Sequence, residues 1–275
     1  MVYADGKNFN AVPLGNLKKQ GRLLVGDVVE LKKDDFSSNY VITKVLPRKN
    51  ELIRPKVTNI DQLLIVISAV PKPDLYLVDK LIVNSIINDI SPVLVINKTD
   101  LISQEEIDDY INEYGSVVDK IILTSALNNS NIEELKSVLK DKTSVFAGQS
   151  AVGKSSLLNA IDGNINQATN ILSKKVERGK HTTRECTIFV LDNNILIADT
   201  PGFSMLELNI KHTELKDYYP EFAEYTCKFT NCTHTNEQTC NVKLAAQSGL
   251  INNDRYSRYT EIFKQLKTKW EKEYD

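Results

Sequence analysis

The sequence predicts an α/β protein with a mainly parallel, doubly wound central sheet, a small β-barrel before it and a small, mainly helical module after it. Continuous apolar runs alternate with segments of helical spacing between the barrel and the module, as in Leu63–Ile67 and Val93–Ile96. Short alternating strands precede these runs, and a Cys/His cluster follows them. We therefore expect three domains, at residues 1–60, 61–205 and 206–275.

Length, composition and charge indicate a folded protein outside the membrane. The 275 residues are 41% hydrophobic, which is enough for several cores. Apolar runs stay well short of the roughly 18 residues of a membrane span, and the N-terminus lacks the apolar stretch of a secretion signal. We expect a cytoplasmic monomer with no membrane partner.

Charge is unevenly distributed along the chain. Residues 1–60 hold 11 Lys and Arg against 6 Asp and Glu, whereas residues 61–210 hold 13 against 20. The basic stretch 44–56 includes Arg48 and Lys49 and lies in the predicted OB-type barrel, where such cations can follow a nucleic-acid backbone. RNA binding is one interpretation of this excess, and a solvated basic face is the other.

The segment after residue 61 gives the order of the central elements. Helical spacing over Leu75–Ile90 joins the two apolar runs into a β-α-β unit. Ser103 and Glu106 form a capping box that opens the next helix. A strand at 121–123 and a helix over Ile132–Leu139 follow, so the strands are expected to be parallel, with ligand loops at their carboxyl ends.

The stretch from Gly148 to Ser155 fits the phosphate-binding pattern of Gly, four residues and Gly-Lys-Ser/Thr without a mismatch. By chance this pattern occurs in roughly one chain in a hundred of this length. Lys154 would reach the β- and γ-phosphates, and the Ser155 hydroxyl would hold Mg²⁺. The predicted loop consists of Gly148, Gln149, Ser150, Ala151, Val152, Gly153, Lys154, Ser155 and Ser156.

Two further motifs identify the nucleotide. Asp199 and Gly202 follow a predicted strand and supply the second magnesium-side element of a P-loop NTPase. A carboxylate in the base-reading motif can accept both N1–H and the amino group of guanine, a donor pair that adenine lacks, so GTP and GDP are favoured. The base-reading residues are Asn97, Lys98, Thr99 and Asp100, with Ser125 and Ala126.

The base-reading motif precedes the phosphate loop, which indicates a circularly permuted P-loop GTPase. With the basic barrel and the Cys/His cluster, the chain resembles the bacterial small ribosomal subunit biogenesis GTPase family over nearly its whole length. The resemblance also rests on Gly-Lys-His-Thr-Thr at 179–183. Two departures are a shorter start to the barrel and Ala151, where many relatives have glycine; we expect the loop to tolerate alanine if φ there is negative.

The resemblance implies hydrolysis of GTP to GDP and phosphate, stimulated by the small ribosomal subunit, with rRNA as a partner and late subunit maturation as the role. Phe203 occupies the position where many GTPases have a water-orienting glutamine, so unaided hydrolysis should be slow. His181 is the candidate to replace it, and a solvated loop histidine is the alternative. Thr183 is our choice for the threonine on Mg²⁺, with Thr182 as the other possibility. Lys154 completes the catalytic set.

Cys227, Cys232, His234 and Cys240 predict a structural zinc site, because three thiolates and one imidazole make a closed tetrahedral set. Disulfides fit poorly with a reducing cytoplasm. Cys186 lies in a strand pattern and is interpreted as a core residue.

The last helix carries one apolar face, for which packing is favoured over base stacking. Its members are Tyr256, Tyr259, Phe263, Leu266 and Trp270.

Two other functional classes stay open on the sequence. One is a nucleotide-gated rRNA-binding protein in which hydrolysis is incidental. The other is a metabolic NTPase or kinase acting on a small molecule, against which Asp100 argues.

Overall fold

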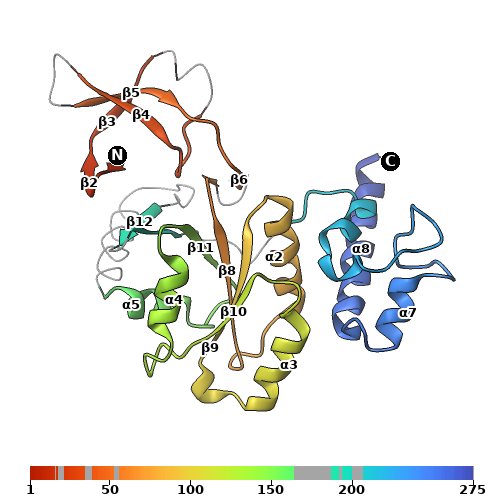
Figure 1. Cartoon of the computed structure of the whole chain (residues 1–275). Helices are drawn as coiled ribbons and strands as arrows, with labels where there is room; N and C mark the ends of the chain where they lie inside the picture. The colour runs from red at the N-terminus through yellow and green to blue at the C-terminus, as the bar shows by residue number, and fades with distance from the viewer. Residues whose placement is uncertain are drawn as a thin grey trace.

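The chain forms an N-terminal β module, a central α/β unit and a C-terminal helical module, as Figure 1 shows. This arrangement confirms the predicted fold class. The computed structural model describes residues 1–15, 17, 22–34, 39–52, 56–163, 187–191, 194–199 and 207–274.

A six-stranded sheet in the order β10-β9-β8-β11-β13-β12 forms the centre of the molecule. Neighbouring strands from β10 to β13 are parallel, and β12 pairs antiparallel with β13 at the edge. The predicted mainly parallel sheet is therefore confirmed. The strands are β8 (Gln62–Ser68), β9 (Ser91–Asn97), β10 (Lys120–Leu123), β11 (Thr143–Ala147), β12 (Thr187–Leu191) and β13 (Ile195–Asp199).

Helices cover both faces of this sheet, which explains why its strands are continuously apolar. Alternate residues of β8 enter different cores: Leu63 and Ile65 pack with residues of α2, whereas Leu64 and Val66 pack with residues of α4 and α5. The helices are α2 (Leu75–Ile87), α3 (Gln104–Tyr114), α4 (Ile132–Leu139) and α5 (Lys154–Ile161).

Local signals set the helix ends. The Ser103–Glu106 capping box is present at the start of α3, as predicted. Helix α2 ends at Ile87 rather than at Ile90, because Asn88 caps it and Asp89 adopts a positive φ of 53°.

The N-terminal module consists of short strands in three groups. The first group is the pair β1 and β2. The second is a three-stranded sheet with β5 between β3 and β4, and the third is the pair β6 and β7. The first residues of the chain thus supply three short strands. The bounds are β1 (Val2–Ala4), β2 (Lys7–Phe9), β3 (Ala11–Pro13), β4 (Val29–Lys33), β5 (Tyr40–Val45), β6 (Glu51–Leu52) and β7 (Val57–Thr58).

The C-terminal module shares a hydrophobic core with one face of the sheet. Tyr259, Phe263 and Leu266 are buried in the cluster that contains the α2 side chains, so the apolar face of the last helix packs as expected. Figure 1 shows α8 beside α2. The elements are η4 (His212–Tyr218), η5 (Pro220–Phe222), α7 (Asn241–Gln247) and α8 (Asn253–Tyr274).

Candidate functional site

The phosphate loop follows β11 and leads into α5, at the carboxyl edge of the sheet. A Cβ atom on Gly148 would lie 2.3 Å from the Val66 carbonyl oxygen, and one on Gly153 would lie 2.3 Å from Asn97 Nδ2. Both glycines also have a positive φ, of 128° and 97°. These two positions therefore require glycine for packing as well as for backbone conformation.

Ala151 differs from the expectation of a negative φ. Its φ is 65°, in the left-handed region, where an alanine is strained by roughly 1 kcal/mol relative to glycine. Ala151 is exposed, so its methyl group has room in the structure. The strain comes from the backbone conformation and not from a steric clash with neighbouring residues.

Lys154 contacts its own loop. Its Nζ donates to the carbonyl oxygens of Gly148, at 2.7 Å, and Gln149, at 2.6 Å. Burial within the loop lowers the pKa of this ammonium from its ordinary value. The side chains of Ser155 and Ser156, at the start of α5, are exposed. The loop therefore carries a partly buried cation beside two exposed hydroxyls, a donor set suited to phosphate and Mg²⁺.

Asn97 joins the base-reading loops to the phosphate loop. Its Nδ2 donates to the Val152 carbonyl at 2.9 Å, and its Oδ1 accepts from the Ala126 N–H at 3.3 Å. Lys98 Nζ also joins the base-reading segment to the phosphate loop, because it donates to the carbonyl of Ala151 at 2.8 Å. The loops that follow β9, β10 and β11 are thus fixed to one another.

Asp100 presents an exposed carboxylate beside this junction. Its Oδ1 accepts a hydrogen bond from the Ser125 hydroxyl, which orients the group. Thr99 Oγ1 donates to the Thr124 carbonyl at 3.1 Å and holds the segment that carries Asp100. An oriented carboxylate can accept two donors from one edge of a base, and the assignment of guanine to Asp100 stays a prediction.

The remaining predicted nucleotide residues are only partly described. Asp199 is the last residue of β13, which is parallel to β11, so its backbone lies at the same edge of the sheet as the phosphate loop. The predictions for His181, Thr182, Thr183, Gly202 and Phe203 lie outside the described residues, as does that for Cys186.

The Cys/His residues converge in the C-terminal module. The ligand atoms of Cys227, Cys232, His234 and Cys240 all lie within 4.8 Å of one another. His234 Nδ1 is 3.5 Å from Cys227 Sγ and 3.3 Å from Cys240 Sγ. A tetrahedral ion with Zn–S bonds of about 2.3 Å and a Zn–N bond of about 2.0 Å sets its ligand atoms roughly 3.5–3.8 Å apart, so this group fits zinc.

A set of hydrogen bonds holds the loop around His234. Glu237 accepts from the N–H groups of Thr233, at 2.7 Å, and Thr235, at 2.9 Å. The Tyr256 hydroxyl donates to the His234 carbonyl at 2.7 Å. Burial lowers the pKa of His234, which favours the neutral imidazole that a metal ligand must be.

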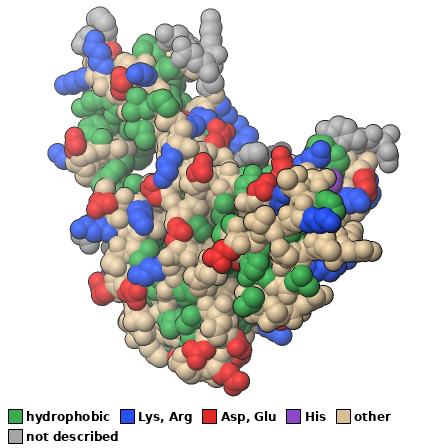
Figure 2. Space-filling model, turned by 45° about the vertical axis from the view of Figure 1, so that its right-hand side comes forward, with side chains coloured by type: hydrophobic (Ala, Val, Ile, Leu, Met, Phe, Trp, Pro, Cys, Tyr) green, Lys and Arg blue, Asp and Glu red, His purple; other side chains and the backbone are tan. Residues whose placement is uncertain are grey.

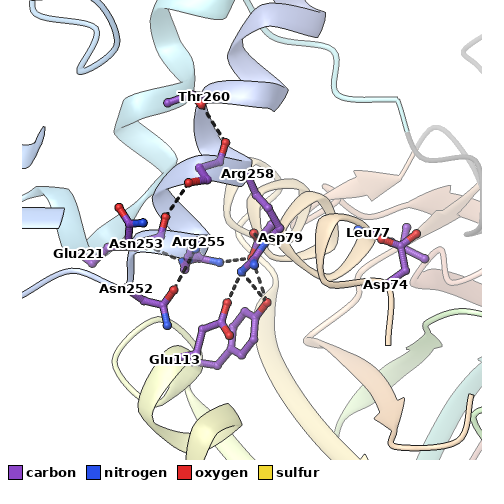
Figure 3. Close-up of polar contacts among 12 residues, drawn as sticks. Asp74, Leu77, Asp79, Glu113, Glu221, Asn252, Asn253, Arg255, Arg258 and Thr260 are labelled. Atoms are coloured by element: carbon purple, nitrogen blue, oxygen red, sulfur yellow. Dashed lines mark hydrogen bonds and ion pairs between the residues drawn. The ribbon is translucent and has the colours of Figure 1, made fainter. Parts of the chain in front are cut away.

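Sequence reasoning did not predict a buried ion cluster between α2 and α8 (Figure 3). Asp79 in α2 forms ion pairs with Arg255 and Arg258 in α8. Glu221 pairs with Arg255, and Glu113 pairs with Arg258. The signal in the sequence is Asp79, the one acidic residue among the apolar side chains of α2, since a buried carboxylate requires a cationic partner.

A family model described as RsgA GTPase matches residues 45–209. Several similar proteins carry the name "Small ribosomal subunit biogenesis GTPase RsgA". The protein from Caldanaerobacter subterraneus subsp. tengcongensis is 44% identical over 255 residues, covering 91% of this chain and 86% of the relative. The one from Thermotoga maritima is 41% identical over 257 residues, covering 92% and 85%.

Two solved structures share the fold. The crystal structure of YjeQ from Thermotoga maritima matches with a TM-score of 0.83 and 37% identity, covering 95% of this chain and 91% of that one. YloQ, described as a circularly permuted GTPase, matches with a TM-score of 0.78 and 34% identity, covering 94% and 86%. Of the helices in the described part of the chain, none has the length and apolar character of a membrane span.

Proposed function

The chain belongs to the RsgA GTPase family, and we propose that it hydrolyses GTP when the small ribosomal subunit stimulates it, in late maturation of that subunit. The partner comes from the names of its relatives, which are small ribosomal subunit biogenesis GTPases. We further propose a cytoplasmic monomer with domains at 1–60, 61–205 and 206–275.

The observation that carries the guanine preference is the position of Asp100. Its carboxylate is exposed, is oriented by Ser125 and lies on a loop that Asn97 fixes to the phosphate loop. A base held by Asp100 would therefore have its phosphates directed toward Lys154. This geometry supports GTP over ATP and argues against a small-molecule kinase.

The catalytic roles are part of the proposal. Lys154 binds the β- and γ-phosphates, and His181 orients the attacking water in place of the missing glutamine. Ser155 and Thr183 would hold Mg²⁺ near Asp199, and Gly202 would meet the γ-phosphate. When bound, Mg²⁺ offsets charge that develops on the phosphate oxygens.

The charge distribution supports an rRNA partner. Figure 2 shows Lys and Arg side chains on both sides of the hollow between the N-terminal β module and the C-terminal module, with Asp and Glu side chains spread over the same face and grouped at its lower end. Arg48 is paired with Asp27 and Glu51 and is largely committed to the fold. Lys32 and Lys33 are exposed and are the better candidates for phosphate contacts.

The test of the proposed function measures GTP hydrolysis with purified small subunits, with naked rRNA and with neither. We expect that the small subunits stimulate GTP hydrolysis and that naked rRNA does not. Equal turnover in all three samples would favour the nucleotide-gated rRNA-binding alternative. Asp100→Asn should exchange guanine for xanthine preference, and failure to do so would reopen the metabolic NTPase class.

The rRNA contact is tested by salt dependence. Replacing Lys32 and Lys33 by alanine should lower the slope of log affinity against log salt by about one for each lysine that neutralises a phosphate. Lys140→Ala, at an exposed position of the acidic middle region, is the control and should leave the slope unchanged. An unchanged slope in the double variant would exclude this surface.

A further inference from the structure

Gln149 of the phosphate loop contacts the start of helix α2 with both polar atoms of its carboxamide. Its Oε1 accepts from the Asp74 N–H at 2.6 Å, and its Nε2 donates to the Lys72 carbonyl at 2.9 Å. Asp74 is the N-cap of α2, since its carboxylate accepts from the Leu77 N–H at 3.0 Å (Figure 3). The Gln149 side chain thus joins the phosphate loop to the cap of this helix.

The main chain of Gln149 contacts Lys154, the lysine proposed to bind the phosphates. Its carbonyl, with that of Gly148, accepts from Lys154 Nζ. An ammonium group has three donors, so contact with two phosphate oxygens removes at least one of these carbonyl contacts. Binding of phosphate therefore redistributes the hydrogen bonds that Lys154 makes to Gly148 and Gln149, and Gln149 is the residue whose side chain holds the start of α2.

A second contact binds α2 to the C-terminal module. The Asp79 carboxylate accepts from Arg255 and Arg258 of α8, and all three side chains are buried or nearly so. Separating these charges would leave them unpaired in a low-dielectric interior, which is strongly disfavoured. A shift of α2 is therefore expected to carry α8 with it.

Helix α8 in turn holds the loop of the Cys/His group. The Tyr256 hydroxyl donates to the carbonyl of His234 at 2.7 Å, and the Tyr259 hydroxyl donates to that of Thr233 at 2.5 Å. A sequence of direct contacts thus runs from Lys154 to the backbone of a predicted zinc ligand.

We propose that Gln149 is a positioning residue that couples the engagement of Lys154 to helix α2 and, through Asp79 and Arg255, to the Cys/His module. The proposal rests on the nucleotide site of the proposed function and needs no ribosomal partner. Because coupling between two sites is reciprocal, occupancy of the module by a partner would also change nucleotide affinity.

The experiment uses the full-length, zinc-loaded protein without ribosomes. Amide hydrogen exchange of α2 and of residues 232–240 is measured without nucleotide, with GDP and with a non-hydrolysable GTP analogue, at concentrations that saturate each variant. In the wild type we expect nucleotide to change exchange at both places by about fivefold or more. In Gln149→Ala the change at 232–240 should disappear, and nucleotide affinity should fall about tenfold.

Two more variants sharpen the result. Gln149→Glu keeps the acceptor for Asp74 and loses the donor to Lys72, so an intermediate change is expected. Gln104→Ala removes an exposed glutamine that bonds Asp108 within α3 and should behave as the wild type. The proposal is overturned if nucleotide leaves exchange at α2 unchanged in the wild type, or if the response at 232–240 is the same in Gln149→Ala. Either result leaves the ribosome-stimulated activity to be judged by its own assay.

Discussion

Asp79 and Arg255 are 176 residues apart in the sequence and form an ion pair whose side chains are 0% and 1% exposed. Burial alone would lower the pKa of the Arg255 guanidinium, but Asp79 and Glu221 raise it above its ordinary value. The arginine is therefore charged, and contact between α2 and α8 keeps Asp79 beside it, while Glu221 pairs with it from within the C-terminal module. This pair fixes the C-terminal module to the sheet more specifically than the shared apolar core does.

Asp79→Asn should lower the free energy of unfolding by about 3–5 kcal/mol, because it leaves two buried arginines without their shared carboxylate. Chemical denaturation followed by far-UV circular dichroism measures the change. Glu133→Gln is the matched control, since the Glu133–Lys136 pair joins an 87% exposed carboxylate to a nearby lysine. That pair should contribute less than about 0.5 kcal/mol. Similar losses in both variants would contradict the importance assigned to burial.

Asp27→Asn should destabilise the N-terminal β module. Asp27 accepts from Arg48 Nε at 2.7 Å, the Leu24 N–H at 2.8 Å and the Thr58 hydroxyl at 3.2 Å. Burial raises the pKa of this carboxyl. The Arg48 contact and the backbone hydrogen bond together lower it by more than burial raises it, so the net pKa lies below the ordinary value. At neutral pH we expect a loss of about 1–3 kcal/mol.

The sign of this pKa shift gives a pH dependence. Asp27 contributes stability above its unfolded-state pKa, and the contribution is lost as pH falls through the lower folded-state pKa. The difference between wild type and Asp27→Asn should therefore be largest at neutral pH and should shrink as the pH falls below the ordinary Asp pKa of about 3.9. Amide exchange of β4 and β5 across this range measures it. A difference that grows on acidification would contradict the assignment.

Local patterns made much of the fold predictable. The bounds of α4 match the predicted Ile132–Leu139, because apolar spacing and turn residues specify a short amphipathic helix without tertiary information. The Cys/His group and the loops at the carboxyl edge also follow from short motifs whose chemistry needs fixed spacings. Strands β1 to β3 were missed because they are short and lack a buried face.

Tertiary contacts account for what the sequence did not predict. The positive φ of Ala151 depends on how the loop closes, and the Gln149 contact depends on where α2 begins. The pairing of Asp79 with Arg255 requires contact between two helices that are far apart in the sequence, and no local sequence pattern predicts that contact. Such contacts require the fold to be known first.

Gly153→Ala should reduce nucleotide affinity by at least about tenfold. The new Cβ would lie 2.3 Å from Asn97 Nδ2 at a φ of 97°, so it would displace the side chain that joins the base-reading and phosphate loops. Titration with a fluorescent GDP analogue measures the affinity. Gly163→Ala, where no heavy atom lies within 4 Å of the added Cβ, should bind as the wild type does. Equal affinity in the two variants would show that the Asn97 contact is dispensable.

Glu237→Ala should weaken zinc binding by about 10- to 100-fold, although Glu237 is not a predicted ligand. Its carboxylate accepts hydrogen bonds on both sides of His234, from Thr233 and Thr235, and so fixes the loop that presents the imidazole. Competition with a chromophoric chelator measures the affinity of the full-length protein for zinc. Glu224→Ala removes an exposed carboxylate of the same module and should leave zinc affinity unchanged. If both variants retain wild-type affinity, the loop does not need Glu237, and the four ligands alone position the ion.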